Sequence, residues 1–334
     1  MSAFANCAAS TADPLASPTR TRLILSAPVP AANLPLAALP LPMLSPVTPP
    51  WLGAMRRTCK LVQQTHLSPK KRQRHVRALR TLVDAYAPWV IAHGGPAPLA
   101  PALECMLEYG DGEDKVHVAR SLEGWYAAMA RSPDCQTLLL KILESCPSAH
   151  SLVFGELVLY GVLLLLLHCT ASGVLLAAYD AHADEDERAS IVRGLHGHVA
   201  CQVAERRGSV RSLGDALREC RQPGEAYLIL GATKNNLLTI FNQQNPVILS
   251  SALFHRALCE YLQALHVLPK QLSDPWRSDV VPKCMEHVGL LALSADGTRI
   301  IEEINSIVEN TMTMPIMPPI MPTIDMESAS TRLA

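Results

Sequence analysis

Apolar residues recur along most of the chain at the three- and four-residue spacing of amphipathic helices. In the segment after Pro69, for example, Val76, Leu79 and Val83 share one helical face, and the basic residues fall mostly on other faces. Ser68 precedes this segment as a candidate N-cap, and Pro69 takes the first helical position, where a backbone N–H would have no intrahelical partner. The pattern therefore predicts a helix that begins at Pro69.

The composition favours helices in the rest of the chain as well. Leu and Ala dominate, whereas only 4% of the 334 residues are aromatic and β-branched runs are scarce. We therefore expect an all-α protein. Residues 1–50 are expected to form a disordered Pro/Ala-rich lead, and residues 311–334 a disordered Pro- and Met-rich tail.

Two blocks of the sequence resemble each other. "YGDGEDKVHVARSLEG", from Tyr109, is echoed by "YDAHADEDERASIVRGLHG", from Tyr179, and the Arg, Leu and Gly residues near their ends lie 73 positions apart. Because another helix pair separates the blocks, the structural unit is near half of that spacing, about 36 residues, which is the size of a stacked helical repeat. We therefore predict a right-handed α-solenoid of stacked, armadillo-like repeats whose neighbours share a core.

A long apolar stretch lies between Glu156 and Asp180. Its 23 residues include no charged side chain, and that length can span a bilayer. However, His168, Thr170 and Ser172 interrupt the stretch, and no positive cluster flanks it. We predict two buried helices joined by a short turn, with a membrane span as the alternative.

The organisation becomes less regular toward the C-terminus. Residues 51–222 are expected to contain a basic lead-in helix and helical repeats, and residues 223–310 further degenerate repeats or a C-terminal helical domain. The segment "PGEAYLILGATKNNLLTIFNQQNPVILSS" is compatible with a short strand or an irregular helix. A helix is predicted over Ala252–Leu265, followed from Trp276 by one more helix pair.

The formal net charge of −1 conceals a marked asymmetry. From Met55 to Arg80 there are nine basic residues and no acidic one, whereas residues 151–230 contain seven basic and ten acidic residues. A basic segment on a neutral or acidic body suits local contact with phosphate groups. The alternatives are a solvated helix face and a localisation signal within "KKRQRH". The nine residues are Arg56, Arg57, Lys60, Lys70, Lys71, Arg72, Arg74, Arg77 and Arg80.

The residue types of catalytic and metal sites are present only in scattered form. The ten cysteines include no CxxC pair; Cys105, Cys135, Cys169 and Cys259 fall in apolar helical pattern, and we expect buried thiols in a reducing compartment.

Three further features have structural explanations. His196, His198 and Cys201 do not converge as zinc ligands on a helix, so we interpret the histidines as helix-terminal residues. "GATKNN", from Gly231, lacks the spacing of a phosphate loop, and the run Asp184–Glu187 suits a first helical turn. Neither a GxSxG nor an HExxH motif occurs. We expect no enzyme activity, no cofactor and no metal.

Several segments resemble Pumilio (PUF) repeats, and within that family the nucleolar Puf-A, or penguin-type, branch. They are "SLEGWYAAMARSPDCQTLLLKIL", "LLHCTASGVLLAAYDAHADEDERASIVRGLHGHV" and "AERRGSVRSLGDAL". The segment from Trp51 to Tyr86 looks like the basic helix before the first repeat of that branch, and "HVGLLALSADGTRIIEEI" resembles its C-terminal helical domain. The resemblance covers about residues 51–305 and implies a solenoid of Pumilio repeats.

In PUF proteins that read sequence, each repeat meets one base through two or three side chains. The positions that the resemblance implies here are Gln136, Thr137 and Leu140, then Ser172, Gly173 and Leu176, then Thr298, Arg299 and Glu302. Because leucines cannot hydrogen-bond with a base edge, we expect no readable base code. Prolines inside the expected helix of the first repeat, "HGGPAPLAPALECML", suggest a diverged copy.

These observations lead to one functional expectation and its competitors. We expect an RNA-binding protein of low sequence specificity whose contacts are the nine basic residues together with Gln136, Thr137, Ser172, Thr298 and Arg299. The resemblance implies a monomer that binds structured rRNA or mRNA with ribosome-assembly proteins, in the nucleolus or in translational regulation, away from membranes. A cytoplasmic location is the alternative. The competing class is an armadillo-like protein-interaction scaffold, favoured by the near-zero net charge and by apolar Leu140 and Leu176.

Overall fold

The computed structural model describes residues 50–208, 210–267, 270–292 and 295–312, and every regular element within these ranges is a helix. In chain order, with η for short 3₁₀ helices, they are α1 (Pro50–Val62), α2 (Pro69–Gly94), η1 (Ala97–Leu99), α3 (Ala100–Tyr109), α4 (Gly112–Ser121), α5 (Tyr126–Arg131), α6 (Gln136–Ser145), η2 (Pro147–Ala149), α7 (His150–Tyr160), α8 (Val162–Leu167), α9 (Ala171–Ala181), α10 (Glu185–Leu195), α11 (His198–Arg207), α12 (Leu213–Arg218), α13 (Pro223–Gln243), α14 (Pro246–Leu249), α15 (Ala252–Val267), α16 (Lys270–Glu286), α17 (Val288–Leu291) and α18 (Ala295–Met312). The all-α prediction is confirmed. The predicted lead and tail lie outside the described residues, except for Pro50, Thr311 and Met312, which are helical.

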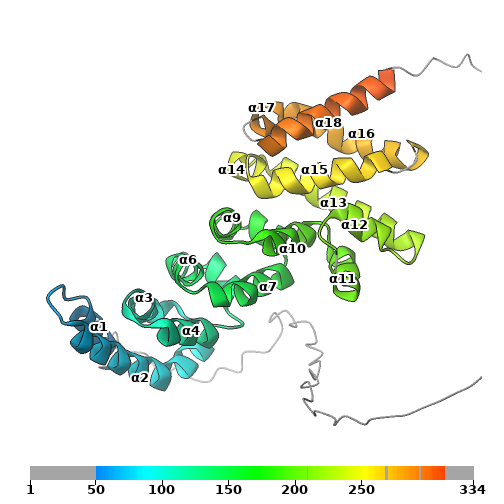
Figure 1. The fold of residues 1–334 in the computed structure, drawn as a ribbon. Coiled ribbons are helices and arrows are strands. Elements are labelled where there is room, and N and C mark those ends of the chain that lie inside the picture. The colour runs from blue at the N-terminus through cyan, green and yellow to red at the C-terminus, as the bar shows by residue number, and fades with distance from the viewer. Residues whose placement is uncertain (1–49, 209, 268–269, 293–294, 313–334) are drawn as a thin grey trace, which may run out of the picture. The chain divides into compact units, whose positions relative to one another are not determined.

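Successive helices pack against one another in chain order (Figure 1). Helices α1 and α2 pack against α3, α3 against α6, and α6 against α9, while α7 packs against α5 and α10. Further along, α15 contacts α9, α12 and α18. Each layer therefore buries its apolar side chains against the layers before and after it, which defines an all-α solenoid, as predicted.

The repeat length agrees with the sequence periodicity. Helices α3, α6 and α9 begin 36 and 35 residues apart. The two similar blocks contain α4 and α10 and end at the turns before α5 and α11. Asp111 and Asp184 cap α4 and α10 with reciprocal capping boxes. Gly124 and Gly197 follow at equivalent turns with φ of +86° and +93°, in the left-handed region that favours glycine. The 73-residue echo therefore corresponds to two structural units.

Most prolines of the N-terminal part stand at helix starts, whereas Pro88 lies inside α2. Ser68 is the N-cap of α2 and Pro69 its first residue, as predicted, although α1 precedes α2 as a second lead-in helix. Pro96 and Pro98 belong to the η1 turn, and Pro101 lies in the first turn of α3. Because backbone N–H groups of a first turn have no intrahelical acceptor, a proline there costs little. The prolines of "HGGPAPLAPALECML" therefore lie at the start of the first-repeat helix and not inside it, which corrects the placement expected from the sequence.

The Leu-rich stretch forms α7, α8 and α9. The turn at residues 168–170 separates α8 from α9, which confirms the predicted break, and buried Leu157, Leu165 and Leu175 anchor the three helices in the core. Gly161, with φ of +117°, adds a second break between α7 and α8 that the run of apolar residues did not indicate. None of the helices that the structure describes is long and apolar enough to cross a membrane.

The segment from Pro223 forms the long helix α13 and then the short helix α14, so the short strand considered for it is wrong. Helix α13 contacts α8, α10, α11, α12, α15 and α16. Because partners surround it on several sides, its apolar residues are not confined to one stripe, which explains the blurred periodicity. "GATKNN" lies inside this helix and forms no phosphate loop. Helix α15 follows the predicted bounds closely, and α16, α17 and α18 complete the described fold.

Candidate nucleic-acid interface

The outer face of α2 is basic. Lys70, Lys71, Arg74 and Arg77 are all exposed and lie opposite the buried face of the helix. Among the described residues, these four cations line a groove of about 860 Å³ together with Ser68, Pro69 and Gln73. None of the four cations forms an ion pair with a residue that the structure describes. Their charges therefore face solvent without an internal counterion.

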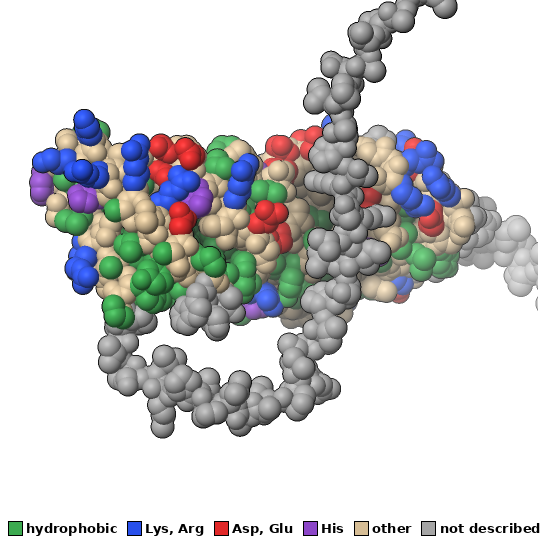
Figure 2. Space-filling model, turned by 90° about the horizontal axis from the view of Figure 1, so that it is seen from below, with side chains coloured by type: hydrophobic (Ala, Val, Ile, Leu, Met, Phe, Trp, Pro, Cys, Tyr) green, Lys and Arg blue, Asp and Glu red, His purple; other side chains and the backbone are tan. Residues whose placement is uncertain are grey.

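Helix α1 extends this basic character. Arg56, Arg57 and Lys60 are exposed, while Met55 and Cys59 on the other face of α1 are buried. Figure 2 shows Lys and Arg side chains gathered over the α1–α2 part of the molecule, at its left, with acidic side chains mainly in the middle and a second group of Lys and Arg near the right end. We call the seven exposed cations of these two helices the basic surface: Arg56, Arg57, Lys60, Lys70, Lys71, Arg74 and Arg77.

The other two predicted basic residues contact their own chain. The guanidinium of Arg72 donates to the carbonyl of Gln64 at 3.1 Å and lies over the ring of Tyr109, 5.3 Å from its centroid. Arg80 pairs at 3.3 Å with both Glu113 and Asp114 in the first turn of α4. These two arginines hold α2 against the preceding loop, α3 and α4, so they contribute to the fold and only indirectly to an outer contact.

The expected base-reading positions are mostly occupied or covered. The amide of Gln136 on α6 donates to the carbonyl of Thr170 at 3.2 Å, and Thr137 beside it is exposed. Ser172 on α9 is only 7% exposed, so its hydroxyl does not face an incoming base. Thr298 and Arg299 on α18 are exposed. The polar side chains at the candidate base-reading positions of α6, α9 and α18 are therefore not equally exposed to solvent.

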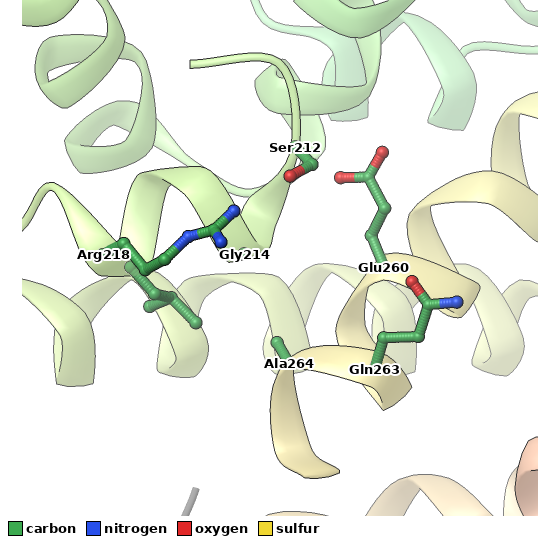
Figure 3. A pocket seen from close by; sticks show the side chains of 7 residues that line it. Ser212, Gly214, Arg218, Glu260, Gln263 and Ala264 are labelled. Atoms are coloured by element: carbon green, nitrogen blue, oxygen red, sulfur yellow. The ribbon is translucent and has the colours of Figure 1, made fainter. Parts of the chain in front are cut away.

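A recess of about 410 Å³ lies between α12 and α15 (Figure 3). Its lining includes Ser212 and Glu260, whose carboxylate points toward the start of α12. One oxygen of Glu260 accepts from the backbone N–H of Leu213 at 2.8 Å and lies 3.1 Å from Nε2 of His196. The other accepts from Arg256 at 3.2 Å. Both oxygens are engaged, so Glu260 acts as a helix cap and a junction between α10, α12 and α15.

Burial and hydrogen bonding act in opposite directions on two carboxyl groups. Burial raises the pKa of Glu260, but the bonds from His196, Leu213 and Arg256 outweigh it and hold this pKa below its usual value. Burial also raises the pKa of Glu156, and there it prevails over the backbone N–H donors, among them Gly124, which cap α5 through this carboxylate. Both groups are explained by helix capping between neighbouring layers.

The predicted helix-terminal histidines are confirmed. His196 is the C-cap of α10, and His198 begins α11. Across the described ranges, no three His, Cys, Asp or Glu side chains gather as a metal site. Six of the described cysteines are buried, as expected, but Cys169 is exposed, because it lies in the turn between α8 and α9 and outside any helix.

Stacked helix pairs with a shared core define this chain as an all-α helical-repeat protein. Its fold is similar to that of human Puf-A, with a TM-score of 0.60 to the crystal structure of that protein and 0.61 to the crystal structure of its complex with DNA. Both likenesses have 18% sequence identity and cover 76% of this chain and 47% of the solved chain. The chain thus spans about half the length of these solved structures, and the predicted Puf-A-like fold is confirmed. No protein-family model and no curated protein sequence matches the chain.

Proposed function

We propose that this chain binds RNA through the basic surface of α1 and α2, with low sequence selectivity. The observation that carries the proposal is the set of seven exposed cations in a segment that holds no acidic residue between Met55 and Arg80. A phosphate backbone offers repeated negative charges at the spacing of successive nucleotides. Binding releases the counterions condensed on that backbone, which provides a large, salt-dependent share of the free energy of association.

The low selectivity follows from the residues on α6 and α9. Base recognition needs accessible amide, hydroxyl or charged side chains at matched positions of successive repeats. Here the amide of Gln136 is already bonded to Thr170, and Ser172 and Leu176 are buried. Phosphate contacts position a nucleic acid without reporting its sequence, so a basic surface without base contacts binds many sequences alike.

The structural likeness supports the same class of ligand. Human Puf-A, whose fold this chain shares, has been crystallised in complex with DNA. We further propose that this chain acts in the nucleolus of the nucleus, during ribosome biogenesis or in the regulation of translation. In this role it is a monomer, and its partners are structured rRNA or mRNA and ribosome-assembly proteins. Imaging of the tagged full chain beside a nucleolar marker tests the location, and exclusion from the nucleus would contradict it.

The binding proposal is tested by fluorescence polarisation with single-stranded RNA, structured RNA and DNA at two salt concentrations. Unrelated RNA sequences of equal length should bind with affinities within about threefold, and all should weaken steeply between about 50 and 200 mM salt. No binding at the lower concentration would contradict the proposal. A single preferred sequence that binds a hundredfold more tightly would contradict the low selectivity.

A second function, protein binding, is favoured by exposed apolar side chains on other helices. Leu159 and Leu164, around the α7–α8 turn, are 83% and 57% exposed, and Leu228 on α13 is 62% exposed. The apolar residues first considered for this role do not support it, because Leu176 is buried and Leu140 half-buried. Affinity purification with and without nuclease separates the two functions: a scaffold keeps its partners after RNA digestion, whereas partners recruited through RNA are lost.

A further inference from the structure

Ser68 lies at the rim of the basic groove. It occupies the end of the turn between α1 and α2, is exposed, and has an extended backbone with φ −64° and ψ +148°. As the N-cap of α2 its hydroxyl could accept a backbone N–H, yet it makes no such capping hydrogen bond. The same groove is lined by Lys70, Lys71, Arg74 and Arg77. The hydroxyl is therefore accessible and stands among the cations proposed to bind phosphate groups.

The residues after Ser68 form an acceptor sequence for one class of enzyme. Proline-directed protein kinases require a proline directly after the acceptor serine, and many prefer a basic residue at the third position after it. Ser68 is followed by Pro69, Lys70 and Lys71. Ser132 provides an internal comparison, because it also precedes a proline but is followed by Asp134 and is half-buried between α5 and α6.

Access for a kinase requires only a local opening. The residues before Ser68, from Gln63, are outside any helix. The carbonyl of Ser68 accepts from the backbone N–H groups of Lys71 and Arg72, each at 3.0 Å. Release of the first turn of α2 breaks these two bonds and the side-chain bond from Arg72 to the carbonyl of Gln64. Helix ends fray readily, and Pro69 contributes no N–H bond of its own. The extended substrate conformation is therefore reached without disturbing the core.

We propose that Ser68 is a phosphorylation site for a proline-directed kinase, and that its phosphorylation releases nucleic acid from the basic surface; the second half rests on the proposed function. In the transfer, the Ser68 oxygen attacks the γ-phosphorus of ATP, the bond to the bridging oxygen breaks, and ADP leaves. The hydroxyl proton passes to the carboxylate base of the kinase. The product is a phosphoserine with a charge of about −1.5 to −2 near neutral pH.

The position of this charge determines its effect. A phosphate at the N-terminus of α2 is stabilised by the helix dipole, so the helix should remain folded. It also provides Lys70, Lys71 and Arg74 with an internal anion, which competes with the phosphates of a bound RNA. If the modification cancels about two phosphate contacts, single-strand affinity should fall at least about tenfold at 50 mM salt, and the salt slope should decrease by about 1.4.

The test uses the full chain with Ser17→Ala, because Ser17 precedes Pro18 and a basic Arg20 in the same pattern. This chain and the same chain with Ser68→Ala or Ser132→Ala are incubated with ATP and a proline-directed kinase. The phosphorylated residue is mapped by mass spectrometry, and the affinity for single-stranded RNA is measured before and after. We expect phosphate on Ser68 and a tenfold loss of affinity in the parent and in Ser132→Ala, with neither in Ser68→Ala.

Two results would overturn the proposal: no phosphate on Ser68 in the folded chain, or a phosphorylated Ser68 with unchanged affinity. If the unmodified chain binds no RNA, the proposed function fails and the regulatory half is overturned with it. The phosphate map is independent of RNA binding and still decides whether Ser68 is a kinase site. The two failures are thus distinguishable in one set of samples.

Discussion

Removal of the cations on α2 should reduce the salt dependence of RNA binding. The variant replaces Lys70, Lys71, Arg74 and Arg77 with Ala; all four are exposed and make no ion pair within the described ranges, so the fold should tolerate the change. Arg72 is left in place, because it packs over Tyr109.

The expected magnitude follows from the number of exposed cations. If all seven residues of the basic surface contact phosphates of a single strand, the slope of log affinity against log salt is at most about −5, or about a thousandfold weakening from 50 to 200 mM salt. With three contacts left, the slope is about −2 and the weakening about twentyfold. Polarisation titrations at four salt concentrations between these limits resolve the difference, and circular dichroism reports whether the variant remains helical.

The matched control replaces four other exposed arginines: Arg206, Arg207, Arg211 and Arg218. It changes the net charge equally, but each of these residues pairs with a carboxylate, namely Glu225, Glu219, Asp186 and Asp215. Its salt slope should stay close to that of the unmodified chain. Equal loss of slope in the two variants would show that net charge alone matters, and an unchanged slope in the α2 variant would refute the assigned surface.

The remaining predictions concern the stack that supports this surface. Glu260→Ala should lower the free energy of unfolding by about 3 kcal/mol, because it leaves buried polar partners such as His196 unpaired. The control Glu205→Ala, at an exposed position, should change this free energy by less than about 0.5 kcal/mol. Urea titrations measure both. Because the pKa of Glu260 is depressed in the folded chain, its contribution to stability is complete above the unfolded pKa of about 4.3 and is lost as the pH falls through the folded pKa. The melting temperature of the unmodified chain should therefore fall more steeply with decreasing pH than that of Glu260→Gln. Gly194→Ala should lower the free energy of unfolding by about 1–3 kcal/mol, because the new Cβ would stand 2.5 Å from the side chain of Val162. Adding Val162→Ala should restore part of this loss. The control Gly173→Ala, where the new Cβ meets no atom, should not destabilise α9.

The repeat architecture could be predicted because its signals are local. Asp111 and Asp184 cap their own helices, and Gly124 and Gly197 are needed at turns only a few residues later. Such features recur in the sequence 73 residues apart, which is the length of two structural units. A single run of apolar residues is less informative, as the unexpected break at Gly161 shows, because only the backbone reveals where two short helices meet.

The basic surface was predictable as a segment but not residue by residue. The absence of acids from Met55 to Arg80 is visible in the sequence. The ring under Arg72 and the carboxylates that pair with Arg80, however, come from α3 and α4, more than about thirty positions later, so only the packed structure separates these two from the exposed cations.

The candidate base-reading positions depended on which helix face is open, and the sequence did not determine this. Ser172 is small and polar, yet α9 packs against α5, α6, α8 and α15, which covers it. Glu260 was missed for a related reason: it accepts a hydrogen bond from the backbone N–H of Leu213, in the first turn of α12, and Leu213 lies 47 positions away in the sequence. No local pattern marks such a contact.

The most direct test of the account is photo-crosslinking of a bound single-stranded RNA to the full chain, with the linked peptides identified by mass spectrometry. The account predicts that the crosslinks concentrate in peptides of α1 and α2, between Arg56 and Arg77. Crosslinks confined to α6, α9 and α18, with none in α1 or α2, would contradict it.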